Sequence, residues 1–147
     1  VAAKRVGKKG TVIGIDLLPM EPIEGVHFIQ GDFTSSEYEQ ALCRCVDGRK
    51  MDVVMSDMAP NLSGVALSDQ IRMIHLAEQA FAFALSVLQP EGCFVVKLFQ
   101  GVGFDAFVAE VRKSFIHVKI RKPKASKSKS KEVYLFARKF RAIMPIR

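Results

Sequence analysis

The sequence predicts an α/β protein whose sheet is mostly parallel and doubly wound, in the Rossmann-like manner. Short apolar runs alternate with helix-period patterns over most of the 147 residues, which is typical of parallel strands joined by crossover helices. The last two apolar runs have only a loop between them, and such a connection suits an antiparallel pair. We therefore expect a parallel sheet with an antiparallel C-terminal hairpin at one edge.

Apolar spacing and helix-breaking residues set the expected bounds of the elements. Ser35 and Ser36 ahead of Glu37 form a helix-start signal, and Pro90 with Gly92 ends the longest helical pattern. The expected helices cover 1–6 as a last turn, the stretch from Ser35 to the Asp-Gly break at 47–48, about 68–88, and 104–115. The expected strands cover 11–16, 26–32, 51–57, 93–99, 117–121 and 133–140.

Length and composition bound the class of protein. We expect residues 1–147 to form a single domain, because this length supports one core. No run is long or clean enough to span a bilayer, and no charged-then-apolar leader is visible. Three cysteines without zinc-type spacing indicate free thiols in a reducing compartment. The three histidines are scattered, so we expect no metal site.

The net charge of +7 is unevenly distributed. Residues 1–111 hold 9 Lys/Arg and 14 Asp/Glu, whereas residues 112–147 hold 13 Lys/Arg and one acid, Glu132. A solvated basic tail is one interpretation, but here cations alternate with apolar residues in an expected strand, which favours a fixed surface for a polyanion such as nucleic acid. The candidate RNA-binding residues lie in and beside a basic flexible loop over 122–131, and they are Arg121, Lys122, Lys124, Lys127, Lys129 and Lys131.

Charged residues stand where buried strands should be apolar. Asp16, Asp32 and Asp57 each end an expected strand, and Lys97 lies within one. A buried unpaired charge is costly, and ligands of open α/β sheets bind at the carboxyl ends of the strands. The pattern therefore predicts an active site at that edge of the sheet.

The first two acids suit a nucleoside. In a nucleoside-binding sheet, Asp16 can accept both hydroxyls of a ribose, and Asp32 can accept the exocyclic amine of an adenine. The alternative is that each carboxylate only caps a turn, as aspartate often does. Recurrence at successive strand ends favours the ligand-binding interpretation.

Asp57 and Lys97 indicate a functional site more specifically than Asp16 and Asp32 do. Pro60 restricts the residue before it to extended conformations, so the segment 56–61 is expected to hold Asp57 in a fixed turn. Lys97 is flanked by apolar residues, so its ammonium needs a carboxylate or a functional cavity, and Asp57 and Glu132 are the candidates. A purely structural salt bridge is the alternative.

Several of these segments resemble the FtsJ family of S-adenosylmethionine-dependent 2′-O-ribose RNA methyltransferases. The resemblance covers nearly the whole chain, and it rests on Asp-Leu-Leu-Pro-Met at 16–20, Gln-Gly-Asp-Phe at 30–33, Ser-Asp-Met-Ala-Pro-Asn at 56–61, Phe-Val-Val-Lys-Leu-Phe-Gln-Gly at 94–101 and Ser-Lys-Glu-Val-Tyr at 130–134. The expected C-terminal hairpin also favours the methyltransferase variant of the Rossmann-like fold.

The resemblance implies roles for individual residues. Asp57, Lys97 and Glu132 would be three of the family's four catalytic residues, with Lys97 acting on the target hydroxyl. The cofactor would be S-adenosylmethionine, bound by Asp16, Asp32, Phe33 and Asp57. The implied substrate is a ribose, and specifically a uridine, of large-subunit ribosomal RNA, within the large ribosomal subunit and in the cytoplasm.

The chain departs from the family pattern at its start. The family has an upstream segment with the first catalytic lysine, then a strand and a Gly-rich turn, whereas no Gly-rich turn precedes Asp16 here. We interpret the chain as an N-terminally incomplete copy whose first strand and Gly-rich loop are missing. That strand would lie between those ending at Asp16 and Asp57, so we expect the 147 residues alone to bind cofactor poorly and to have little activity.

Two other functions remain open from the residues alone. The segment Gly101–Ala106 fits G-x-G-x-x-A between a strand and a helix, which is compatible with an NADP-linked oxidoreductase. The basic C-terminal region is compatible with a non-catalytic RNA-binding module. Base stacking in such a module would need exposed aromatic residues on strands, and the helical phenylalanines are typical of packing instead.

Overall fold

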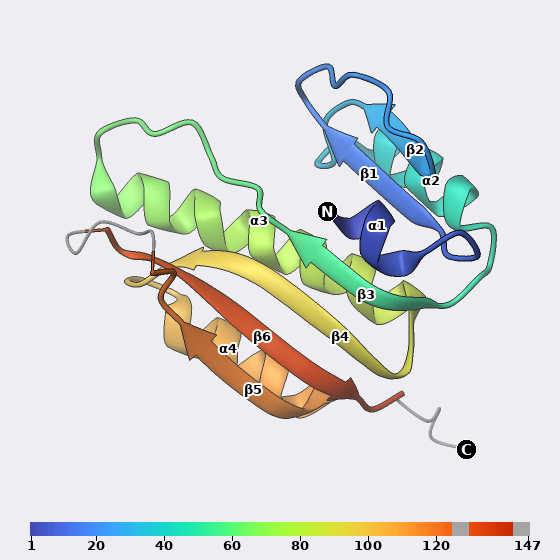
Figure 1. Cartoon of the computed structure of the whole chain (residues 1–147). Coiled ribbons are helices and arrows are strands. Elements are labelled where there is room, and N and C mark those ends of the chain that lie inside the picture. Colours follow the sequence, from blue (N-terminus) through green and yellow to red (C-terminus); the bar gives the residue numbers. More distant parts are fainter. Residues whose placement is uncertain (125–129, 143–147) are drawn as a thin grey trace. The chain divides into compact units, whose positions relative to one another are not determined.

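The computed structural model describes residues 1–124 and 130–142, and the chain divides into two compact units. The first unit spans Val1–Arg49 and the second Lys50–Arg147. Figure 1 shows the order of the elements along the chain. Among the described residues, no helix combines the length and the apolar character needed to cross a membrane.

The first unit is a short parallel β-pair with two helices. It contains α1 (Ala2–Val6), β1 (Val12–Asp16), β2 (Val26–Gln30) and α2 (Ser36–Val46). The ladder runs from Val12 opposite Val26 to Asp16 opposite Gln30, so the two strands end together. The Gly31 amide donates a hydrogen bond to the Asp16 carbonyl (2.8 Å), which fixes the start of the loop after β2. The unit therefore brings two strand-end loops to one edge.

The second unit is a four-stranded mixed sheet. Its elements are β3 (Met51–Ser56), α3 (Ala66–Val87), β4 (Leu88–Phe99), α4 (Phe104–Ser114), β5 (Phe115–Arg121) and β6 (Glu132–Phe140). The strand order is β3-β4-β6-β5, with β3 and β4 parallel and both ladders of β6 antiparallel. The expected C-terminal hairpin at the edge of the sheet is therefore confirmed. Figure 1 shows α3 and α4 on the same face of this sheet.

Alternation along β4 decides which side chains enter the core. Phe94, Val96 and Leu98 are at most 1% exposed, whereas their neighbours in the strand are only partly buried. On β6, Leu135 and Ala137 complete the same buried face, against which α3 and α4 pack. Because side chains alternate along a strand, the intervening residues of β4 must point to the other face of the sheet. Lys97 is one of them.

The start of β4 differs from the sequence prediction. The strand begins at Leu88 rather than at residue 93, and its ladder with β3 shifts between Met51 opposite Leu88 and Val53 opposite Cys93. This bulge accommodates Pro90 and a positive φ of 69° at Glu91. A Cβ on Gly92 would lie 2.8 Å from the Gln89 carbonyl oxygen, so only glycine fits there. Pro90 and Gly92, which would end a helix, thus lie in a bulge within a strand.

The strands form two separate hydrogen-bonded sheets. One contains β1 and β2, the other β3, β4, β6 and β5, and no ladder joins β1 to β3 within residues 1–124 and 130–142. Strands β1 and β3 thus each have one edge without a ladder in the described sheets.

Candidate active site

The first unit holds Asp16 and Asp32 in similar turns. The Asp16 carboxylate accepts a hydrogen bond from the Leu18 amide (3.0 Å) through Oδ1. The Asp32 carboxylate accepts bonds from the Thr34 amide (2.9 Å) and hydroxyl (2.6 Å), also through Oδ1. These bonds to Thr34 hold the pKa of Asp32 below its usual value. Both acids therefore cap turns, and the bonds to Thr34 favour the ionised form of Asp32.

Turn capping leaves the outer carboxylate oxygens available. Both side chains are exposed, and the Oδ2 atoms of Asp16 and Asp32 make no hydrogen bond within the described part of the chain. The turns orient these oxygens, because each carboxylate is held at one end by a main-chain amide two residues on. The structural and ligand-binding interpretations of the two acids are thus compatible.

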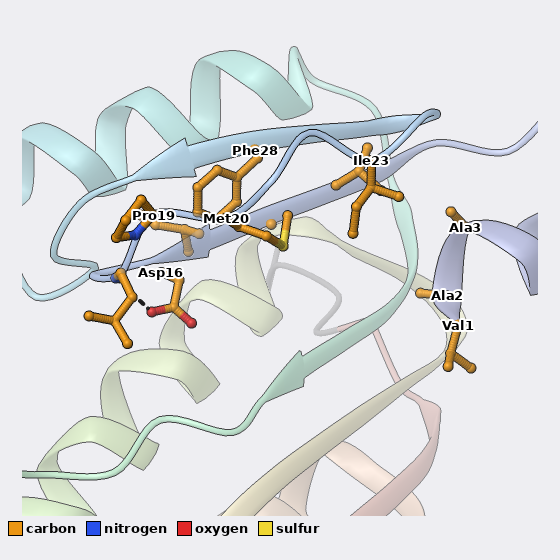
Figure 2. A pocket seen from close by; sticks show the side chains of 12 residues that line it. Val1, Ala2, Ala3, Asp16, Pro19, Met20, Ile23 and Phe28 are labelled. Atoms are coloured by element: carbon orange, nitrogen blue, oxygen red, sulfur yellow. Dashed lines mark hydrogen bonds between the residues drawn. The ribbon is translucent and has the colours of Figure 1, made fainter.

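An apolar hollow of about 410 Å³ lies beside Asp16. Its lining includes Ile23 and Phe28 together with the Pro19–Met20 turn. Figure 2 shows the Asp16 carboxylate next to that turn, with the dashed bond to the Leu18 amide. An apolar surface with a carboxylate at its side suits a ligand that has a flat ring and hydroxyl groups, as a nucleoside does.

Phe33 follows Asp32 but is buried, with 9% of its surface exposed. Its ring packs in the interior, so a ligand near Asp32 would meet the Phe33 main chain instead. The sequence prediction grouped Phe33 with the cofactor-binding residues without separating the ring from the backbone.

In the second unit, Lys97 forms an ion pair with Asp57. The Lys97 ammonium lies 3.1 Å from Asp57 Oδ1, and the Lys97 side chain is 13% exposed against 72% for Asp57. Ser56 of β3 lies opposite Val96 of β4 in the parallel ladder. The residues that follow them, Asp57 and Lys97, are therefore neighbours near the same end of the sheet, where they can pair. The apolar neighbours of Lys97 predicted that its ammonium needs a carboxylate or a functional cavity, and the structure provides a carboxylate.

Tyr134 is the third member of this group, and the sequence analysis did not single it out. It lies directly opposite Lys97 in the β4–β6 ladder, and its hydroxyl donates a hydrogen bond to Asp57 Oδ1 (2.7 Å). This bond, with lesser contributions from burial and from the charges of Asp57 and Glu132, raises the pKa of Tyr134 to about 12. One carboxylate oxygen thus holds both an ammonium and a phenol.

Glu132 opens the last strand, as expected, but it is not paired with Lys97 in the part of the chain that the structure describes. It opens β6 opposite Phe99, two residues before Tyr134, and its amide donates to the Ser130 hydroxyl (3.2 Å). Among the described residues it makes no ion pair with Lys97. Its charge acts on the Tyr134 hydroxyl, since it contributes to the raised pKa of that group. Of the two expected carboxylate partners of Lys97, the structure therefore pairs only Asp57.

The first turns of α3 hold the loops that follow β3 and β4. Asp69 is 7% exposed and accepts bonds from the Ser63 amide (2.9 Å) and hydroxyl (2.8 Å), which lower its pKa. Gln70 accepts a bond from the Val102 amide (3.1 Å) in the loop after β4. A Cβ on Gly101, where φ is 148°, would lie 2.5 Å from the Gln70 amide carbon. Adjacent residues of one helix thus position the loops next to Asp57 and Lys97.

The expected RNA-binding residues are placed only in part. Arg121, Lys122, Lys124 and Lys131 are exposed, and the Lys122 ammonium donates to the Ser130 carbonyl (2.7 Å) across the base of the loop. Lys127 and Lys129 lie outside the described residues. Within residues 1–124 and 130–142, no three His, Cys, Asp or Glu side chains are grouped as a metal site.

Acidic residues at the carboxyl ends of parallel strands, together with a C-terminal antiparallel hairpin, are typical of a Rossmann-like methyltransferase. Comparison with known proteins agrees with this class. The chain belongs to the FtsJ-like methyltransferase family, whose sequence profile matches residues 1–140.

Individual relatives are similar over nearly the whole chain. The ribosomal RNA large subunit methyltransferase E of Marinobacter nauticus is 53% identical over 96% of this chain and 68% of its own length. The protein of the same name from Dechloromonas aromatica is 52% identical over 96% and 69%. A crystal structure assigned as a ribosomal RNA methyltransferase of Plasmodium falciparum superposes with a TM-score of 0.77 at 27% identity, covering 93% of this chain and 76% of that one.

The hydrogen bond from Tyr134 to Asp57 predicts a late tyrosine titration. The pKa of about 12 lies above the ordinary value of 10, so the bond stabilises the fold at neutral pH and is lost as the pH rises through about 12. Ultraviolet absorbance of tyrosinate, followed against pH, measures this. The difference between the wild type and Tyr134→Phe should titrate near 12, and a difference curve centred near 10 would show that the bond does not form.

Proposed function

We propose that the protein transfers the methyl group of S-adenosylmethionine to the 2′-hydroxyl of a ribose in large-subunit ribosomal RNA. The observation that carries this proposal is the Lys97–Asp57 ion pair at the carboxyl ends of β4 and β3, with Tyr134 bonded to the same carboxylate. Membership of the FtsJ-like methyltransferase family supports it, as do relatives named for action on ribosomal RNA.

Lys97 is the residue we assign to the target hydroxyl. When bound, S-adenosylmethionine supplies a methyl group on a sulfonium, which is already a good leaving group, so the protein's main task is alignment. The Lys97 ammonium can donate a hydrogen bond to the 2′-oxygen and stabilise charge there as the hydroxyl loses its proton. Asp57 pairs with the ammonium, and the Tyr134 hydroxyl bonds to the same Asp57 oxygen, which helps to orient the carboxylate. Glu132 acts on this group through its charge near Tyr134.

Asp16, Asp32 and the Phe33 main chain are the residues we assign to the nucleoside part of the cofactor. Their donor chemistry fits it: the outer oxygens of Asp16 can accept ribose hydroxyls, and those of Asp32 can accept an exocyclic amine. The apolar hollow beside Asp16 offers a surface for the ring. We assign Asp57 to the part of the site beside the methyl group of the bound cofactor. The family profile spans both compact units, and on this ground we propose that residues 1–147 work as one methyltransferase domain.

The finer substrate assignments are also part of the proposal. We infer a uridine as the target nucleotide, the large ribosomal subunit as its context and the cytoplasm as the location. The basic residues at and beside the loop 122–131 are assigned to the RNA, namely Arg121, Lys122, Lys124, Lys127, Lys129 and Lys131. The excess of 13 Lys/Arg over one acid in residues 112–147 supports this assignment.

The oxidoreductase alternative has little support from the loop that suggested it. A dinucleotide site needs free main-chain amides and open space at the glycines of its motif. Here the Val102 amide is bonded to Gln70, and the Gln70 side chain fills the space beside Gly101. The non-catalytic RNA-binding module is the second candidate, favoured by the basic C-terminal region alone, and the next experiment separates it from the enzyme.

Methyl transfer from labelled S-adenosylmethionine to ribosomal particles tests the proposed function. The resemblance implies a further lysine and a Gly-rich turn upstream, so the assay is run on this chain and on the chain extended at its N-terminus by the corresponding family segment. In the active form, Lys97→Ala should lower the rate at least about a hundredfold, because it removes the group that acts on the hydroxyl proton.

The matched control is Lys113→Ala, which removes an exposed lysine paired with Glu110 on α4 and should leave the rate unchanged. Full activity of Lys97→Ala would contradict the assigned role. No transfer by either form of the protein, with RNA binding intact, would favour the non-catalytic module.

Asp16→Asn tests the cofactor assignment separately from catalysis. Asparagine keeps an acceptor for the Leu18 amide but loses the charge, and charge-assisted hydrogen bonds are about twice as strong as neutral ones. Titration calorimetry should show S-adenosylhomocysteine binding about tenfold more weakly. The control Glu39→Gln removes an exposed acid of α2 and should bind as the wild type does. Equal affinities of Asp16→Asn and the wild type would place the nucleoside elsewhere.

A further inference from the structure

The β5–β6 hairpin has a cationic face that the loop residues do not account for. Cross-strand partners on this face are His117 with Arg138, Lys119 with Phe136, and Arg121 with Tyr134. The four cations His117, Lys119, Arg121 and Arg138 are exposed, and we call them the β5–β6 basic face. The opposite face of the hairpin carries the core, including Val118, Ile120, Val133, Leu135 and Ala137.

This basic face begins next to the proposed catalytic lysine. Tyr134 lies opposite Lys97 on one side and opposite Arg121 on the other, so these residues form one row across β4, β6 and β5. With strands about 4.8 Å apart, the backbone of Arg121 is about 10 Å from that of Lys97. Lys119 and His117 then follow along β5 in steps of about 7 Å. The cations therefore lead away from Lys97 along the edge strand.

These four cations outnumber the acidic residues on their two strands. In the described ranges, none of the four basic-face residues takes part in an ion pair. Glu132 is the one acid in residues 112–147. Because the cations are carried by paired strands, the fold keeps them close together, and an external anion such as a phosphate would relieve their repulsion.

An exposed aromatic ring favours RNA over other polyanions. Phe136 is 37% exposed and stands between Val95 on β4 and Lys119 on β5. An aromatic residue on a strand beside cations is the combination used to bind single-stranded nucleic acid, in which the ring contacts a base and the cations contact phosphates. An acidic peptide would use the cations but has no need of the ring.

We propose that RNA adjoining the target nucleotide runs over the β5–β6 basic face, with its phosphates on Arg121, Lys119, His117 and Arg138. This inference rests on the proposed function, because it takes Lys97 as the point where the target ribose lies. It adds His117, Lys119 and Arg138 to the RNA-contacting residues and extends the contact from the loop to the strands. The path leads from Lys97 past Tyr134 and outward along β5.

The salt dependence of RNA binding tests the path. Binding of the chain to a labelled single-stranded RNA oligonucleotide is followed by fluorescence anisotropy at several salt concentrations. For single strands, each phosphate contact contributes about 0.7 to the slope of log K against log salt. Lys119→Gln with Arg121→Gln should therefore reduce the slope by about 1.4. The control, Arg112→Gln with Lys113→Gln, makes the same change of net charge on the exposed side of α4 and should leave the slope unchanged.

The possible outcomes separate the RNA path from the proposed function. Equal slopes for the two double variants, or no RNA binding by the wild type, would overturn the path, once thermal unfolding shows that both variants are folded. If methyl transfer to ribosomal particles is intact but Lys119→Gln with Arg121→Gln binds RNA as the control does, the path is wrong and the proposed function stands. If the slope falls as expected but no methyl transfer occurs, the RNA-binding face is supported and the proposed function fails.

Discussion

The ion pair between Lys97 and Asp57 is the interaction on which the candidate site depends. A lysine that is only 13% exposed needs a partner, because removing its ammonium from water is costly. The pair exists because β4 alternates strictly, sending Phe94, Val96 and Leu98 into the core and Lys97 to the other face. The parallel ladder with β3 then brings Asp57 to the same end of the sheet. Core packing and site geometry are thus set by one strand.

The surroundings of this pair limit its movement. Asp69 and Gln70, adjacent on α3, hold the loops that follow β3 and β4. The Gln100 amide, just beyond β4, donates to the Lys131 carbonyl (2.9 Å), which connects the end of β4 to the start of β6. These bonds matter for function because reacting groups must be held within about half an ångström of their working positions.

Sequence reasoning identified the residues that break an apolar pattern but missed those defined by register. Asp16, Asp32, Asp57 and Lys97 were predictable, since each is a charge at the end of, or inside, an apolar run. Tyr134 was not, because its partner is fixed by the β4–β6 ladder, and a shift of one residue would turn its hydroxyl to the core. The early start of β4 at Leu88 was missed for a similar reason: Pro90 and Gly92 end helices, and only the partner strand reveals a bulge.

A double-mutant cycle on methyl transfer tests most directly whether Lys97 and Asp57 act as one unit. The rates of Lys97→Met, Asp57→Asn and the double variant are compared in the active form of the protein. If Asp57 works by holding the ammonium in place, the double variant should be about as slow as Lys97→Met alone, because residues that act together are strongly non-additive. Losses that multiply independently would contradict the account, since each residue would then contribute to the reaction without the other.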